Sequence, residues 1–172
     1  MPSRRLVLVA AVALLVAPGI PSGHAQTDTP EAFLTAIYTR VTAGDGTAGG
    51  AAFSGEKARS RYFVKDLAKV WDEADAEAEK SGEIGPIEFD PFTDSQDPQV
   101  RRFDLRGLEA TAETAKLRVS LFRDRKPKAG EKPQTVLDFT LKREAGGWRI
   151  ADIARRGGEM PWTLIEIFAP LR

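Results

Sequence analysis

Apolar residues recur with a helical period in the first half of the chain and alternate with polar residues in the second half. In residues 30–41 the apolar side chains recur at intervals of three and four, which predicts a helix with one buried face. A second helical region is predicted over residues 56–80, and Ser81-Gly82 ends it. The Gly-rich segment between them, residues 44–55, is expected to be a flexible loop. The predicted core positions of the two helical regions are Leu34, Ile37, Tyr38 and Val41, then Phe63, Leu67, Val70, Trp71, Ala74 and Ala78.

After about residue 102 the period changes to two. Apolar and polar residues alternate in four segments, which predicts four half-buried antiparallel strands. Gly146-Gly147 predicts a tight hairpin turn between the last two. Pro161 predicts the start of a closing helix with Trp162, Ile165 and Phe168 or Ala169 facing inward. The apolar members of the four strands are Phe103 and Leu105; Leu117, Val119 and Leu121; Leu137, Phe139 and Leu141; and Trp148 and Ile150.

The order of these elements predicts an α+β fold. N-terminal helices would pack on a curved antiparallel sheet of four to five strands, and a short C-terminal helix would close the layer. A sheet that curls around a helix forms a cone with a hollow, and ligand sites favour such hollows. We expect residues 26–172 to form one domain, because no internal repeat or linker divides them.

The first 25 residues have the three parts of an export signal. Arg4 and Arg5 give a charged start, residues 6–17 are an unbroken apolar run, and Gly23-His24-Ala25 offers small residues to a signal peptidase. The run has 12 residues, whereas a membrane span needs about 20. We therefore expect cleavage near Ala25-Gln26, no membrane span, and a soluble domain in the periplasm or outside the cell. Ser3-Arg4-Arg5 leaves the twin-arginine route open beside general secretion.

Cleavage would change the available chemistry. His24 is the only histidine, and the chain has no cysteine. A domain without either residue has no Ser-His or Cys-His nucleophile, no Cys/His zinc site and no disulfide. Loss of Arg4 and Arg5 leaves 23 basic residues against 25 acidic ones, a net charge of −2. This balance argues against a nucleic-acid partner, and we expect no cofactor.

Two segments resemble a known family. Residues 146–153, Gly-Gly-Trp-Arg-Ile-Ala-Asp-Ile, are similar to the last-strand motif of the nuclear transport factor 2-like superfamily of cone-shaped α+β domains. Together with residues 90–97 they resemble an exported proteobacterial family of unknown function within it. The resemblance implies a fold and a location, and it implies no activity. The members of the second motif that carry the resemblance are Asp90, Pro91, Phe92, Gln96 and Asp97.

Asp152 is the sharpest candidate for a functional side chain. In a regular strand it shares a face with Trp148 and Ile150, and a carboxylate in an apolar hollow has a raised pKa suited to a general base or a ligand contact. Alternatively, Asp152 has a structural role: its carboxylate accepts hydrogen bonds from a neighbouring loop and fixes the end of the strand. Arg101 is two residues before Phe103, so in a regular strand both side chains point inward. Arg101 would then pair with Asp152 or bind an anionic ligand. A register shift of one residue would place it in solvent instead. Tyr38 completes the candidate ligand-binding set of Tyr38, Arg101, Trp148 and Asp152.

Residues 90–97 also hold several oxygen ligands. Asp90, Asp94 and Asp97 are weak candidates for calcium, because their spacing does not follow the EF-hand pattern. Turns and caps in a rigid connector explain the same residues. Neither a metal site nor a catalytic residue is firmly predicted.

Three functions from different classes remain. The first is non-catalytic binding of a small molecule or peptide in the cone. The second is an interaction or inhibitory module that uses the open sheet face, with a periplasmic protein or a second copy as partner, so that monomer and homodimer are both open. The third is an acid–base enzyme of the isomerase or dehydratase type, with Asp152 as base and Tyr38 or Arg101 steadying the substrate. A cone filled by Phe139, Trp148 and Trp162 would weaken the first and third.

Overall fold

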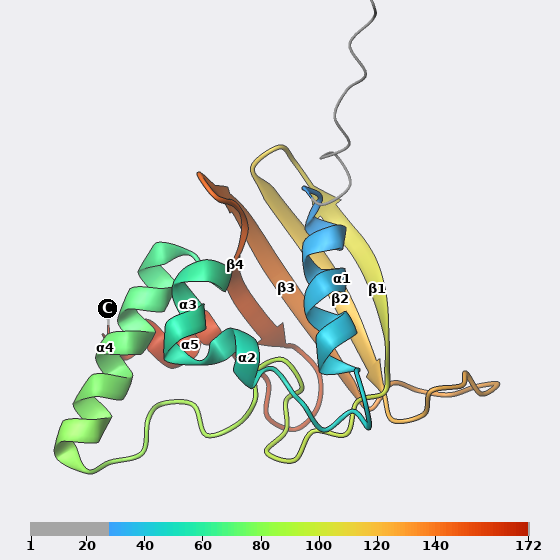
Figure 1. Cartoon of the computed structure of the whole chain (residues 1–172), viewed down its shortest axis with the longest axis horizontal. Coiled ribbons are helices and arrows are strands. Elements are labelled where there is room, and N and C mark those ends of the chain that lie inside the picture. Colours follow the sequence, from blue (N-terminus) through green and yellow to red (C-terminus); the bar gives the residue numbers. More distant parts are fainter. Residues whose placement is uncertain (1–27, 172) are drawn as a thin grey trace, which may run out of the picture.

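The computed structural model describes residues 28–171 and shows an α+β fold (Figure 1). Helices α1, α2, α3 and α4 precede an antiparallel sheet whose strands lie in chain order, and the short helix α5 follows. The predicted export signal lies outside the described residues. Among those that are described, no helix is long and apolar enough to cross a membrane. The elements are α1 (Pro30–Val41), α2 (Ala51–Ser54), α3 (Glu56–Tyr62), α4 (Lys65–Ser81), β1 (Arg102–Ala110), β2 (Thr114–Phe122), β3 (Thr135–Glu144), β4 (Gly147–Arg155), β5 (Trp162–Thr163), α5 (Leu164–Phe168) and the 3-10 helix η1 (Ala169–Leu171).

Helix α1 begins with a capped first turn. The hydroxyl oxygen of Thr29 accepts a hydrogen bond from the Ala32 amide at 3.1 Å, and Pro30 occupies the first turn, where its missing amide hydrogen costs nothing. The helix lies over β1 and β2 on the inner face of the sheet (Figure 1). The four apolar residues that predicted it, Leu34, Ile37, Tyr38 and Val41, are all buried.

The second helical region departs from the prediction in two ways. It is not continuous, because the chain becomes extended at Phe63 and Val64 between α3 and α4. The reason is tertiary: the Val64 amide donates to the Ile150 carbonyl in β4 at 2.9 Å, and that bond replaces a helical one. The second departure lies just before this region: residues 51–54 of the Gly-rich segment, expected to be a flexible loop, form α2 with Phe53 buried.

The four predicted strands are present, with corrections at their ends. The two turn residues between β3 and β4 are Ala145 and Gly146, whereas Gly147 begins β4 at φ +102°, a conformation that favours glycine. Pro161 does not open the closing helix. Residues 162–163 instead form β5 beside β4, and Thr163 caps α5 by accepting from the Glu166 amide at 3.0 Å. Phe168 is buried as expected, but Ile165 and Ala169 are exposed.

Two β-bulges interrupt the sheet. Leu108 is the extra residue in β1, and Ala151 is the extra residue in β4. A bulge bends its strand and reverses the facing of every side chain beyond it. Leu141 pairs with Ile150 and Thr140 with Asp152, so the second bulge determines where Asp152 points.

Aromatic side chains fill the space between the helices and the inner face of the sheet. Tyr38 of α1 contacts the rings of Phe103 and Phe139 at centroid distances of 5.5 and 5.9 Å. Phe92, from the segment before the sheet, packs on Phe139 at 6.2 Å. All three of Tyr38, Phe92 and Phe139 are at most 1% exposed. The packed core therefore occupies the volume in which the sequence placed a ligand.

Candidate functional site

Tyr38 lies in the packed core. Its hydroxyl donates to the Phe92 carbonyl at 2.9 Å, and burial raises the pKa of the phenol well above its ordinary value. A neutral, hydrogen-bonded tyrosine of this kind fastens the segment before the sheet onto α1.

Trp148 is also largely buried, at 5% exposure. Its indole nitrogen donates to the Asp28 carbonyl at 3.0 Å, and the Arg143 guanidinium lies over its ring at 5.6 Å. These contacts fix the start of α1 against the β3–β4 hairpin.

Asp152 does not share a face with Trp148 and Ile150, contrary to the sequence expectation. The bulge at Ala151 turns it to the opposite side. One carboxylate oxygen accepts from the Ile165 amide at 3.2 Å, at the start of α5. Burial raises the pKa of the Asp152 carboxyl, while hydrogen bonds from the amides of Ile165, Ile153 and Leu164 oppose the rise. This geometry matches the alternative in which the residue fixes the strand end.

Arg101 is exposed and does not point into the core, which is a second correction. It lies just before β1, so the alternation of side chains that would place it on the same face as Phe103 does not extend to it. Its Nε donates to the Asp45 carbonyl at 2.8 Å. Strands β2 and β3 separate β1 from the Asp152 strand, so the structure does not bring Arg101 and Asp152 together.

Asp90 organises the segment of residues 90–97. One of its carboxylate oxygens accepts from the Phe92 amide at 2.9 Å, and the other accepts from the Gly50 amide at 2.7 Å and the Thr93 hydroxyl at 2.8 Å. A Cβ added at Gly50 would lie 2.3 Å from the Phe92 ring, so only glycine allows this approach. Asp90 thus attaches the Gly-rich segment and α2 to the connector.

The other acidic residues of the segment have separate environments. Asp94, at φ +54°, accepts from the Trp162 indole at 2.7 Å and pairs with Arg155 at 3.0 Å. Gln96 and Asp97 are exposed, and Pro91 is buried. Within residues 28–171 no three acidic, His or Cys side chains gather in a way that could hold a metal ion. The structure therefore does not bring Asp90, Asp94 and Asp97 together as a calcium site.

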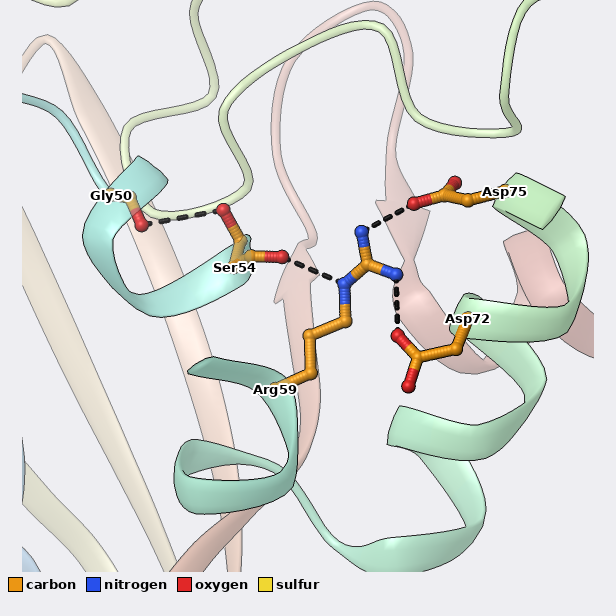
Figure 2. Close-up of polar contacts among 5 residues, drawn as sticks. All are labelled: Gly50, Ser54, Arg59, Asp72 and Asp75. Atoms are coloured by element: carbon orange, nitrogen blue, oxygen red, sulfur yellow. Dashed lines mark hydrogen bonds and ion pairs between the residues drawn. The ribbon is translucent and has the colours of Figure 1, made fainter. Parts of the chain in front are cut away.

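An arginine network that sequence reasoning missed joins α2, α3 and α4 (Figure 2). Arg59 is 6% exposed. Its Nε donates to the Ser54 carbonyl at 2.7 Å, its Nη1 to Asp72 at 2.8 Å and its Nη2 to Asp75, while the guanidinium lies 4.5 Å from the Trp71 ring centre. Each side of the guanidinium fork has a partner, so this network stabilises the helices and offers no open position to a ligand.

A groove between α1 and α3 has a different composition. Its volume is about 400 Å³, within the range of roughly 300–1,000 Å³ typical of ligand sites. Phe33, Phe53 and Tyr62 form its aromatic side, with Tyr62 at 5.0 Å from Phe53 and 6.4 Å from Phe33 between ring centres. The full lining is Ala32, Phe33, Ala36, Ile37, Arg40, Phe53, Arg61, Tyr62, Gly146 and Arg149.

Three arginines of this lining carry its charge. The Arg40 guanidinium lies over Phe53 at 5.3 Å, and that of Arg61 over Tyr62 at 5.6 Å. Arg149 donates to the carbonyls of Gly146 and Trp148 at 3.1 and 2.8 Å. No ion pair within residues 28–171 involves these three arginines, and residues 1–27 contain no Asp or Glu. The groove therefore joins an aromatic surface to positive charge that has no carboxylate partner among the described residues.

The sequence held a signal for this groove. Phe33, Ala36 and Arg40 recur at helical spacing beside the core face of α1, so the helix has a second stripe next to the first. The stripe alone does not identify a site, because the remaining lining comes from α2, α3 and the β3–β4 hairpin.

A second hollow, on the outer face of the sheet, differs in its charge balance. It measures about 540 Å³ and is lined by three arginines among other residues. Arg118 and Arg156 pair with Asp138 at 2.7 and 3.6 Å, and Arg155 pairs with Asp94 at 3.0 Å. Its three arginines share the two carboxylates of Asp138 and Asp94, so most of its positive charge is balanced and it is a weaker candidate for an anionic ligand.

A scan against protein-family models, a search of curated proteins and a search of solved structures each returned no match to this chain.

Proposed function

We propose that this protein is an exported, non-catalytic binding domain that holds a small amphipathic anion in the groove between α1 and α3. The observation that supports this most directly is the set of Arg40, Arg61 and Arg149 beside three aromatic rings, with no ion-pair partner among the described residues. A carboxylate or phosphate would complete the guanidinium forks, while an apolar tail would cover Phe33 and Tyr62.

The lining favours binding over acid–base chemistry. It contains no carboxylate, histidine or cysteine. Asp152, the base of the enzyme alternative, is not among the lining residues and accepts a hydrogen bond from α5 instead. The module that would use the outer sheet face also has less support, because that face of β2 and β3 is polar and includes the paired Arg118 and Asp138.

Fold family and location complete the proposal. The cone-shaped arrangement of the nuclear transport factor 2-like superfamily is supported by the order of helices and strands and by the motif at residues 146–153. Export is supported by the charged, apolar and small-residue parts of residues 1–25. In this version of the cone the interior is packed, and the ligand lies between the helices.

Isothermal titration calorimetry with decanoate tests the proposal. We expect saturable binding of decanoate and no binding of decylammonium, because the groove is cationic; inorganic phosphate should bind far more weakly, because it lacks the tail. The Arg40→Gln/Arg61→Gln double variant should weaken decanoate binding about tenfold or more.

The matched control is Lys57→Gln. Lys57 is an exposed cation on the same helix as Arg61 but does not line the groove, so its removal should leave the affinity for decanoate unchanged. Equal binding of decanoate and decylammonium, or an affinity unaffected by the double variant, would overturn the proposal.

A further inference from the structure

Strand β1 is an edge of the sheet that no other described strand covers. At the other edge, β4 is joined by β5 and contacted by α5. In Figure 1, β1 runs along the outer margin of the sheet, and α1 lies over its face rather than along its edge. An edge strand presents backbone N–H and C=O groups that can pair with another strand. Short strands, charges or a cover usually block such pairing, but β1 has nine residues.

The residues of β1 form a charge pattern that is complementary to itself. Asp104 and Arg106 flank Leu105, and both are exposed. They pair with Ser120 and Arg118 of β2, which places them on the outer face of the sheet. No ion pair within residues 28–171 involves either of them. Each therefore has an unused charge next to an open edge.

A second copy of β1 uses both charges. If two β1 strands pair antiparallel about a two-fold axis at Leu105, Asp104 of each copy lies opposite Arg106 of the other, on the same face. Opposite charges at directly facing positions stabilise a strand pair, and the contact is isologous as a two-fold dimer requires. Phe103 of each copy then lies opposite Gly107 of the other, which has no side chain; the exposed Glu31 carboxylate is its neighbour, 3.3 Å from where a Cβ would be.

Other registers are unfavourable. An axis at Asp104 or at Arg106 brings like charges together, and so does parallel in-register pairing. An axis at Phe103 would place Asp104 opposite Arg102, but Arg102 already pairs with Glu131 at 2.8 Å. An axis between two residues would place outer-face charges beside inner-face apolar side chains. The sequence of β1 thus favours a single register.

We propose that two copies of this protein associate through β1 in that register, so that their sheets form one continuous antiparallel sheet. The bulge at Leu108 ends the regular run at Gly107. The symmetric pairing about Leu105 therefore covers only residues 103–107, so the interface is small and the dimer is weak and reversible. Because its ion pairs are exposed, salt weakens it. This inference is independent of the proposed function, since none of the groove's lining residues lies in β1.

Sedimentation velocity on the purified protein over a range of concentrations tests the proposal. We expect a monomer–dimer equilibrium at low salt that shifts toward monomer at high salt. Asp104→Arg and Arg106→Asp should each be monomeric, since each places like charges opposite one another. Because both residues are exposed, urea unfolding should show unchanged stability for both variants.

Two complementation experiments identify the register. Mixing the Asp104→Arg and Arg106→Asp proteins should give a heterodimer, because the two reversed strands are complementary. The double variant Asp104→Arg/Arg106→Asp should dimerise like the original protein. Lys142→Glu, which reverses an exposed charge on β3 away from the edge, should leave the dimer unchanged. A monomer under all conditions, single variants that still dimerise, or failure of both complementations would each overturn the proposal.

Discussion

Arg59 and Arg61 lie two residues apart on α3, and the structure uses them in opposite ways. Both guanidinium groups lie over an aromatic ring, Trp71 and Tyr62 respectively. Arg59 is buried, with Asp72, Asp75 and the Ser54 carbonyl as partners. Arg61 is exposed beside the groove and has no carboxylate partner within residues 28–171. Stacking on an aromatic ring therefore does not distinguish the two arginines. The carboxylate partners do: Arg59 has them and is structural, whereas Arg61 has none among the described residues and can contact a ligand.

Replacing Arg59 by Ala should give the largest change. The substitution removes three hydrogen bonds and the stacking on Trp71, and leaves two carboxylates near each other. Because Asp72 and Asp75 remain about 40% exposed, at 42% and 40%, water relieves part of the cost, and we expect a loss of about 2–4 kcal/mol in the free energy of unfolding. Urea denaturation measures it.

The neighbour on the same helix is the control. Arg61→Ala should change the free energy of unfolding by less than about 0.5 kcal/mol. Equal effects of the two substitutions would contradict the distinction between them. Arg59→Lys should recover little of the loss, because an ammonium group cannot donate to both carboxylates and the Ser54 carbonyl in the same planar arrangement.

Asp90 and Asp97 form a similar pair among the carboxylates, one with hydrogen-bond partners in the fold and one exposed. Asp90→Ala leaves the amides of Gly50 and Phe92 without their acceptor, which should cost about 2–3 kcal/mol in the free energy of unfolding. Asp97→Ala, in the same motif but exposed, should cost less than about 0.5 kcal/mol. A large effect of Asp97→Ala on urea unfolding would reverse this assignment.

Asp152 gives a smaller effect that depends on pH. Its folded-state pKa is raised above the ordinary value of 3.8, so it contributes most to stability below that value and loses the contribution as the pH rises through the folded pKa. Asp152→Asn keeps an acceptor for the Ile165 amide and removes the charge. We expect the variant to be within roughly 1 kcal/mol of the original protein at neutral pH, and not less stable. Urea unfolding from acid to neutral pH should show a weaker fall for Asp152→Asn, and an unchanged pH profile would contradict this interpretation.

The smallest stability change tests the groove from the opposite direction. Ala36→Glu supplies the carboxylate that the groove lacks, four residues before Arg40 on α1. The new pair with Arg40 offsets the lower helix propensity of Glu, so the free energy of unfolding should change by less than about 0.5 kcal/mol. Decanoate binding should be lost, because the new carboxylate occupies Arg40, repels the ligand carboxylate and fills part of the groove. Thr35→Glu, exposed on the same helix but outside the lining, should not affect binding. Retention of decanoate binding by Ala36→Glu would show that the ligand binds elsewhere.

Local periodicity predicted the elements well, because burial on one face imposes a period on each of them. It placed the core of α1 and the alternation of β2 and β3 correctly. It failed where a distant contact decides the conformation. The break at Phe63 and Val64 depends on Ile150, and the facing of Asp152 depends on a bulge that the alternation of apolar residues does not reveal.

The groove was not predicted for a similar reason. Its lining comes from α1, α2, α3 and the β3–β4 hairpin, which are more than a hundred residues apart at their extremes. Arg59 was overlooked because a single arginine in a charged helix looks like a solvated residue, and only the position of α4 shows that it is buried.

The bulge at Ala151 inserts one extra residue into β4 and shifts the alternation of inward and outward side chains by one position. Before it, the even-numbered residues Trp148 and Ile150 belong to the core; after it, the odd-numbered Ile153 does. Deleting Ala151 would remove the bulge and keep these pairs, with Asp152 opposite Thr140 and Ile153 opposite Phe139. Pairing Ala151 regularly with Thr140 would instead direct the Asp152 carboxylate toward Phe139 and turn Ile153 outward. An alignment or a redesign of this strand that treats residue 151 as an ordinary position would assign every later side chain to the wrong side.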